Sequence, residues 1–256
     1  MRIPGRRTAT LLLLCAICIG HVFAASQDEP YEEILQRAYT YVWFAASTQN
    51  PKGLFFREAT GLFAEAAELR PDQAEPLLMA AMAYQFLGEY SLAEEHYIRA
   101  AEQADDPAVW VLLADFYVTR GRLVEAEKLY RDALDNGYAV VPANVGLAEI
   151  ALRRQQYHAA FEHLETALEQ KPYHIRALVL KAGAYLESGE PERALEVLET
   201  VNPDLVWYLP YHVQMARIHA ALGNHEAACY FVEYVLWRDG EIDAEQWFGN
   251  LNCDDF

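Results

Sequence analysis

Two short stretches come closest to the residue patterns of metal-binding or catalytic sites. Residues 225–229 read His-Glu-Ala-Ala-Cys, which begins like the metal-binding helix of zinc proteases, but a cysteine stands where the second histidine ligand is needed one turn later. His158, Glu162 and His163 lie close together in the sequence, yet histidines five residues apart point in different directions on a helix and form no ligand pair.

Other chemical signatures are missing from the sequence. It contains no nucleophile elbow, no phosphate-binding glycine loop and no kinase motif set. We therefore expect a protein that is not an enzyme and that has no cofactor and no metal site. Binding, rather than catalysis, is the function to look for in the elements that the rest of the sequence encodes.

An alanine recurs along the chain at intervals of 34, 33, 34, 34 and 34 residues. A constant period of this length, with helical patterning inside each unit, indicates a stacked array of helical hairpins. Glycines at a second fixed position mark the bend between the two helices of a unit, except that Leu54 and Gln155 replace glycine in the first and fourth units. The recurring alanines are Ala59, Ala93, Ala126, Ala160, Ala194 and Ala228.

The third unit carries its large and small residues at the positions where the tetratricopeptide repeat family has them. The matching residues are Trp110, Leu113, Ala114, Tyr117, Gly121, Ala126, Tyr130 and Ala133. The chain therefore resembles this family, which implies an all-α, right-handed α-solenoid of about six helix-turn-helix repeats. The expected repeats are residues 40–73, 74–106, 107–140, 141–174, 175–208 and 209–242. Departures from the family pattern include residues 50–53, Asn-Pro-Lys-Gly, which interrupt the first helix of the first repeat.

The two ends of the chain differ from the repeats. Three arginines precede an apolar run of ten residues and then small residues, so residues 1–24 are predicted to be a cleaved signal peptide, and the protein to be exported to a bacterial periplasm. The alternatives are an uncleaved anchor or a lipid-modified Cys15. Residues 25–39 form a lead and a helix into the first repeat, and residues 243–256 are expected to cap the last one.

Charge and cysteine content narrow the class of partner. The net charge of −18 argues against nucleic acid, whose binders need a clustered basic face. Acidic outer helix faces would keep the array soluble, and a dedicated acidic docking surface is the alternative. Cys229 and Cys253 could form a disulfide that pins the tail over the end of the array in an oxidising compartment, but two unlinked thiols are the favoured alternative, because spacing alone cannot place the two Cα atoms close enough.

The resemblance implies a concave groove lined by the first helix of each repeat. In this chain the groove is expected to be apolar, with Asp115, Glu149, Arg176, Gln214 and Arg217 as its polar exceptions. Superhelical packing, or the chain's own N-terminal helix or tail, could instead cover it. The expected binding residues are Tyr41, Phe44, Leu78, Met79, Met82, Phe86, Val111, Leu112, Val118, Val145, Leu152, Val179 and Leu180.

A long apolar groove on a soluble protein is typical of a binding surface. We therefore expect a scaffold or adaptor of the cell envelope, which captures an apolar or amphipathic segment of a protein or peptide partner in envelope assembly, secretion or transport. The alternative is a transporter accessory that holds a small hydrophobic ligand in an enclosed pocket around Met82, Phe86, Leu112 and Val118. Exposed terminal faces would also permit a homo-oligomer.

Overall fold

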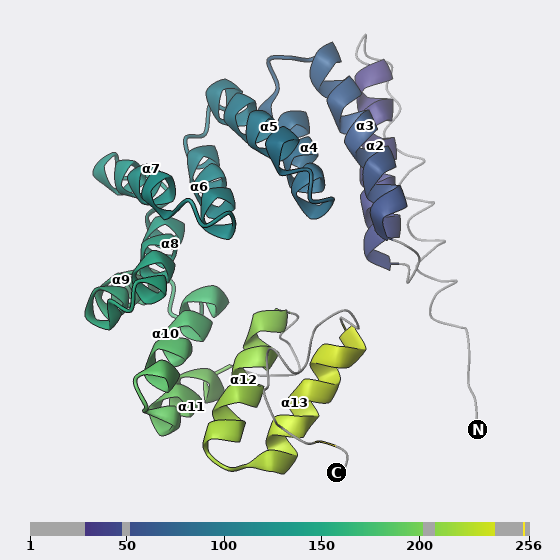
Figure 1. Ribbon diagram of the computed structural model, residues 1–256. Coiled ribbons are helices and arrows are strands. Elements are labelled where there is room, and N and C mark those ends of the chain that lie inside the picture. The colour runs from purple at the N-terminus through teal and green to yellow at the C-terminus, as the bar shows by residue number, and fades with distance from the viewer. Residues whose placement is uncertain (1–28, 48–51, 202–207, 239–252, 254–256) are drawn as a thin grey trace, which may run out of the picture. The chain divides into compact units, whose positions relative to one another are not determined.

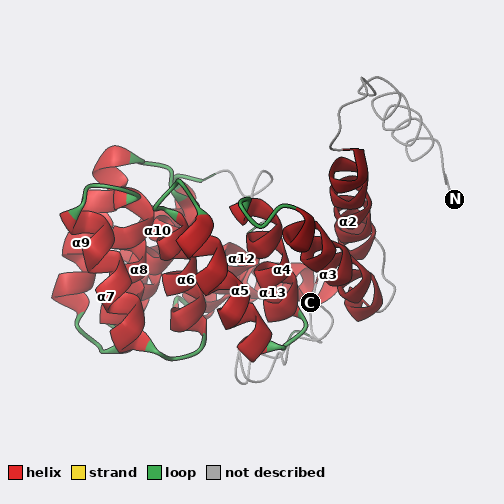
Figure 2. Cartoon of the chain, turned by 90° about the horizontal axis from the view of Figure 1, so that it is seen from above, coloured by secondary structure: helices red, strands yellow, loops and turns green. Residues whose placement is uncertain are grey.

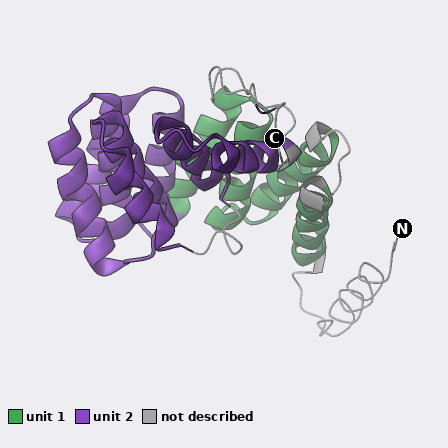
Figure 3. Ribbon diagram, turned by 90° about the horizontal axis from the view of Figure 1, so that it is seen from below, with its two compact units in different colours: residues 1–103 green, residues 104–256 purple. Residues whose placement is uncertain are grey.

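The computed structural model describes residues 29–47, 52–201, 208–238 and Cys253 (Figure 1). All regular structure in these residues is helical, so the prediction of an all-α fold is confirmed. The described residues fall into two compact units, residues 1–103 and residues 104–256 (Figure 3). The predicted signal peptide, residues 25–28 of the segment before the first repeat, and all of the predicted cap except Cys253 lie outside the described residues.

The described residues of the first unit form two helical hairpins. Its helices are α2 (Glu29–Ser47), α3 (Lys52–Leu69), α4 (Ala74–Phe86) and α5 (Tyr90–Gln103). Each helix packs against the next one along the chain. Leu54, which occupies the bend position in the sequence register of the first repeat, lies inside α3, so the first hairpin bends earlier than the others.

The described residues of the second unit form four more hairpins, whose helices and loops are distinguished by colour in Figure 2. The first helices of neighbouring hairpins pack against one another, and the second helix of each hairpin packs against the first helix of the next. The helices are α6 (Val109–Thr119), α7 (Leu123–Asp135), α8 (Val140–Arg153), α9 (Tyr157–Gln170), α10 (Ile175–Glu187), α11 (Pro191–Glu199), α12 (Leu209–Ala221) and α13 (His225–Arg238).

The recurring alanines explain why these hairpins close. All six have no exposed surface, as expected for a position where two helices pack closely and a small side chain is favoured. The bends after the first helices also follow the sequence. Gly88, Gly121, Gly189 and Gly223 have φ between +72° and +82°, and Gln155 adopts the same left-handed conformation with φ of +59°. The backbone of the fourth hairpin therefore keeps the family bend without the residue that favours it.

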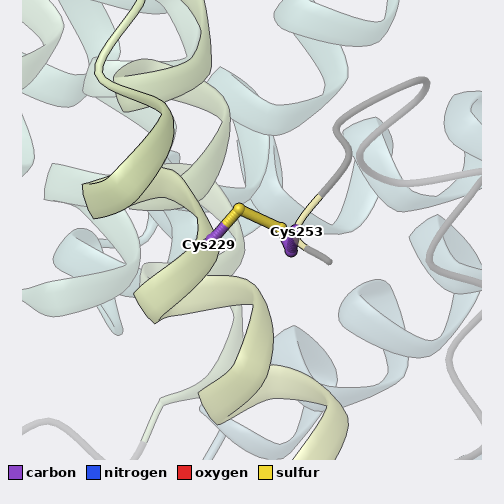
Figure 4. Close-up of a disulfide and its surroundings, with 2 residues drawn as sticks. All are labelled: Cys229 and Cys253. Carbon is purple, nitrogen blue, oxygen red and sulfur yellow. A yellow bond between two sulfur atoms is a disulfide. The ribbon is translucent and has the colours of Figure 1, made fainter. Parts of the chain in front are cut away.

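A disulfide joins Cys229 of α13 to Cys253 (Figure 4). Their Cα atoms are 5.5 Å apart. Cys229 is buried, and Cys253 packs against the core formed by α10, α11, α12 and α13. Of the two alternatives that the sequence left open, the structure has the linked pair. Among the helices of the described residues, none combines the length and the apolar character needed to cross a membrane.

Candidate protein-binding surfaces

In the first unit, the expected groove residues of α4 form an exposed apolar surface. Met82 and Phe86 lie one turn apart on α4 and are 51% and 52% exposed. The Phe86 ring packs on Phe56 of α3, with ring centroids 4.1 Å apart. Met79, expected to continue this stripe, is half-buried against the core between α2 and α3. We call Phe56, Met82 and Phe86 the α4 patch.

A second group of aromatic side chains lies on α2 and α3 of the same unit. Phe44 stacks on Phe55 with ring centroids 5.9 Å apart, and Trp43 meets Phe44 edge-on at 5.2 Å. Tyr41 also stacks on Phe55. Trp43 and Phe44 are exposed, whereas Tyr41 and Leu78 are half-buried. The first unit thus presents aromatic side chains from three helices to solvent.

In the described residues of the second unit, most of the side chains expected to line an apolar groove are buried or half-buried. Val111, Val118 and Val145 are buried at 2% exposure or less, and Val179 is buried at 8%. Leu112 is exposed, and Leu152 and Leu180 are half-buried. The repeat register places a residue on one side of a helix, but the neighbouring helix decides whether that side chain is covered.

A small group of charged side chains links the corresponding helices of the second unit. Arg176 of α10 donates to Asp115 of α6 at 2.9 Å and to Glu149 of α8 at 2.7 Å. The Tyr130 hydroxyl donates to the same Asp115 oxygen at 2.8 Å. Arg153 donates to the second oxygen of Glu149 at 2.9 Å. This ion-pair network ties three successive first helices together.

The electrostatics of the network favour its charged forms. Burial alone would raise the pKa of Glu149, but hydrogen bonds from Arg176 and Arg153 lower that pKa below its usual value. Burial would likewise lower the pKa of Arg176, and the charges of Asp115 and Glu149 raise it instead. The pKa of Tyr130 is raised, first by burial and then by the charge of Asp115, so the hydroxyl stays a hydrogen-bond donor.

Beside the network, a cavity of about 400 Å³ lies between α8, α10 and α12. It combines an apolar floor with charged and amide groups. The sequence register anticipated Val179, Leu152 and Leu180 as groove residues but not the space between them. The lining residues are Glu149, Leu152, Arg153, Gln155, Val179, Leu180, Gly183, Glu187, Gln214 and Arg217.

Gly183 is the signal in the sequence that could have revealed this cavity. It occupies the ninth repeat position, where the neighbouring hairpins have Glu149 and Arg217. Because glycine has no side chain, Gly183 leaves space between the long side chains of Glu149 and Arg217. Of the four residues expected around an enclosed apolar pocket, Met82, Phe86 and Leu112 are 40% to 52% exposed and Val118 is buried.

No group of three or more histidine, cysteine or acidic side chains in the described residues is arranged to hold a metal ion. His225 and Cys229, which begin like a zinc-protease motif, lie on α13, where Cys229 is in the disulfide. His158 pairs with Glu162 on the exposed face of α9, and His163 turns away to hydrogen-bond Asn144 of α8.

Comparison with known proteins bears on the fold. The chain is 28% identical over 116 residues to Protein HemY of Escherichia coli strain K12, a match that covers 44% of this chain and 29% of HemY. The chain therefore spans less than a third of the curated relative that it matches.

Two solved structures resemble most of the chain. The crystal structure of PilW, described as a widely conserved type IV pilus biogenesis factor, is 21% identical, with a TM-score of 0.62 over 87% of this chain and 98% of that one. A tetratricopeptide repeat protein from Parabacteroides merdae is 17% identical, with a TM-score of 0.66 over the same shares. At such identities the likeness shows a shared solenoid fold.

Sequence models of one family match three parts of the chain. They cover residues 78–138, 151–206 and 209–230, all described as tetratricopeptide repeat. These ranges include parts of the hairpins from α4 to α13. Together with the helical hairpins and the solved relatives, they show that the chain belongs to the tetratricopeptide repeat family.

Proposed function

We propose that this protein is a non-catalytic scaffold of the bacterial cell envelope that captures an apolar or amphipathic segment of a protein partner. The observation that carries the proposal is the exposure of Met82 and Phe86 on α4, backed by Phe56. Large apolar side chains in one exposed cluster mark interaction sites more often than isolated ones do. The proposal is therefore narrower than the groove expected from the sequence.

The chemistry of the α4 patch suits a helical partner. Methionine is flexible and polarizable, and the neighbouring aromatic rings offer flat apolar surfaces, so the patch can adapt to different side chains. An amphipathic helix would place residues spaced three and four apart against such a surface. At about 25 cal/mol per Å², burying some 300 Å² of apolar surface would contribute roughly 7 kcal/mol before association costs.

The envelope location rests on different observations. Residues 1–24 have the composition of a secretory signal, and Cys229 and Cys253 form a disulfide, a bond that persists in oxidising compartments. The PilW structure, which resembles this chain, belongs to a pilus biogenesis factor. A partner in envelope assembly, secretion or transport is consistent with all three. Identifying that partner would show in which envelope process the protein takes part.

The test is site-specific cross-linking in cells, followed by affinity capture. A photoreactive amino acid at position 82 should cross-link one or a few envelope proteins, and the double change of Met82→Glu and Phe86→Glu should abolish their capture, because two carboxylates cannot be buried in an apolar contact. The matched control changes Val124 and Tyr173, two exposed residues of the second unit, to Glu and should retain capture.

Each outcome of this experiment decides something. Partners that survive the Met82→Glu and Phe86→Glu changes contradict the proposed site. A cross-link between tagged and untagged copies of the chain would assign the patch to self-association instead.

A further inference from the structure

One end of the first hairpin carries exposed apolar side chains that do not belong to the α4 patch (Figure 1). Trp43 and Phe44 lie near the end of α2, and Leu54 and Phe55 lie in the first turn of α3, at the same end of the hairpin. We call these four residues the hairpin tip. We propose that the hairpin tip inserts into the headgroup layer of a phospholipid bilayer. This contact is separate from protein capture by the α4 patch.

The side chains of the hairpin tip form one apolar cluster. Phe44 stacks on Phe55, and Trp43 meets Phe44 edge-on. Leu54 is 58% exposed, Trp43 49% and Phe44 40%. Because the rings already hold one another, little side-chain freedom is left to lose when a surface covers them. The cluster can therefore leave water at a small entropic cost.

The charge around the hairpin tip favours a phospholipid surface as its partner. Between Glu33 and Glu58 the sequence has no acidic residue, although the whole chain has a net charge of −18. The same stretch contains Arg37, Lys52 and Arg57, and the Arg57 side chain is exposed. Anionic lipid headgroups attract nearby cations and repel carboxylates. The hairpin tip can therefore approach such headgroups without the repulsion that the acidic faces of the chain would meet.

The residue types of the hairpin tip also suit the boundary between water and lipid. Tryptophan is enriched at this boundary because its ring is apolar while its indole N–H can donate to headgroups or water. Phenylalanine and leucine add apolar area that reaches the acyl chains. The ends of helices have unsatisfied backbone groups, so the insertion must stay within the hydrated headgroup layer. Such a shallow contact gives weak, reversible binding.

A double variant removes the apolar surface without adding charge. Trp43→Gln and Leu54→Gln replace two exposed side chains, and glutamine keeps the helix propensity high. The matched control makes the same changes at Val124 and Tyr173, which are exposed in the second unit. Thermal unfolding should show that both double variants fold as the wild type does.

The experiment measures how the protein partitions onto membranes. The full chain is expressed in bacteria, purified after cellular processing of its N-terminus, and floated with vesicles of phosphatidylethanolamine and phosphatidylglycerol. The variant with Trp43→Gln and Leu54→Gln should bind about ten- to a hundredfold more weakly, because burying one large apolar side chain contributes such a factor. The control should bind as the wild type does. The variant with Met82→Glu and Phe86→Glu should also bind, and its failure to do so would overturn the proposal by assigning the lipid contact to the α4 patch.

A photoreactive phenylalanine at position 54 reports contact at the hairpin tip alone. On irradiation with the vesicles it should form a lipid adduct, seen as an increase in mass, and the same probe at position 124 should not. The proposal is overturned if position 54 gives no lipid adduct, or if the variant with Trp43→Gln and Leu54→Gln binds vesicles as tightly as the wild type. It is also overturned if position 54 cross-links in cells to a protein in place of lipid.

Discussion

The ring of Tyr130 lies directly against the backbone of Gly146. A Cβ atom on Gly146 would be 2.2 Å from Cζ of Tyr130, far inside van der Waals contact. Tyr130 has no exposed surface, and its hydroxyl is held by Asp115, so the ring cannot turn aside. Helices α7 and α8 therefore depend on a glycine for their contact at this point.

We expect Gly146→Ala to destabilise the protein. Overpacking should cost about 3 kcal/mol, and the better helix propensity of alanine should return only about 1 kcal/mol. Gly61 in α3 has open space around its Cα and provides the control, because Gly61→Ala should gain about 1 kcal/mol. Urea unfolding measures both changes. Equal stabilisation by the two substitutions would show that the Tyr130 ring is free to move.

The left-handed conformation of Gln155 gives a second prediction. Gln155→Gly should stabilise the protein by about 1 kcal/mol, because a side chain is strained at φ of +59° and glycine is not. Gly121 has the same place in the preceding hairpin with nothing near its Cα, so Gly121→Ala should lose a similar amount. Thermal unfolding checks the pair, and a loss of stability in Gln155→Gly contradicts the prediction.

Arg176 gives a third prediction, because its removal leaves two acids side by side. Arg176→Leu should cost about 2 kcal/mol, since Asp115 and Glu149 would keep their charges in a partly buried place. The cost should shrink when Glu149→Gln is added, because only one of the two charges then remains. Arg99, which is 4.0 Å from Glu95 on the surface, is the control and should cost about 0.5 kcal/mol or less when changed to Leu.

His174 makes the stability depend on pH. Its Nδ1 accepts a hydrogen bond from the Ala177 amide at 3.3 Å and so caps α10, which requires the neutral ring. Burial, then the charges of Lys171 and Arg176, lower its pKa below the usual value of 6.5. Below pH 6.5 the unfolded chain therefore binds more protons at this histidine than the folded one. The free energy of unfolding decreases as the pH is lowered, until the ring in the folded protein is protonated too.

His174→Asn tests this pH dependence, because asparagine can cap the helix and does not titrate. Stability measured between pH 7.5 and 5 should fall less steeply in the variant, by at most about 1.4 kcal/mol per pH unit. Identical slopes in the two proteins would remove His174 from the explanation. His163 and His219, whose pKa values are also lowered by burial, remain in both proteins and contribute equally.

The sequence predicted the hairpins well because backbone contact is a local requirement. Ala126 or Ala160 must be small wherever the helices cross, and that need repeats with the hairpin. Whether a groove side chain is exposed depends instead on the helix that packs beside it. Val145 and Leu112 were both expected to line the groove, yet Val145 is buried and Leu112 is exposed. Arg176 and Asp115 are 61 residues apart, so their pairing required the structure.

The disulfide between Cys229 and Cys253 has a consequence for the whole array. In a stack of repeats, each hairpin is stabilised by packing against its neighbours. The terminal hairpins pack on one side only, so unfolding begins at the ends. The cross-link closes a loop of chain at the last hairpin and, by the chain-entropy estimate, makes its opening harder by about 3 kcal/mol. Fraying in oxidising surroundings should therefore begin at the opposite end, and reduction should allow it to begin at both.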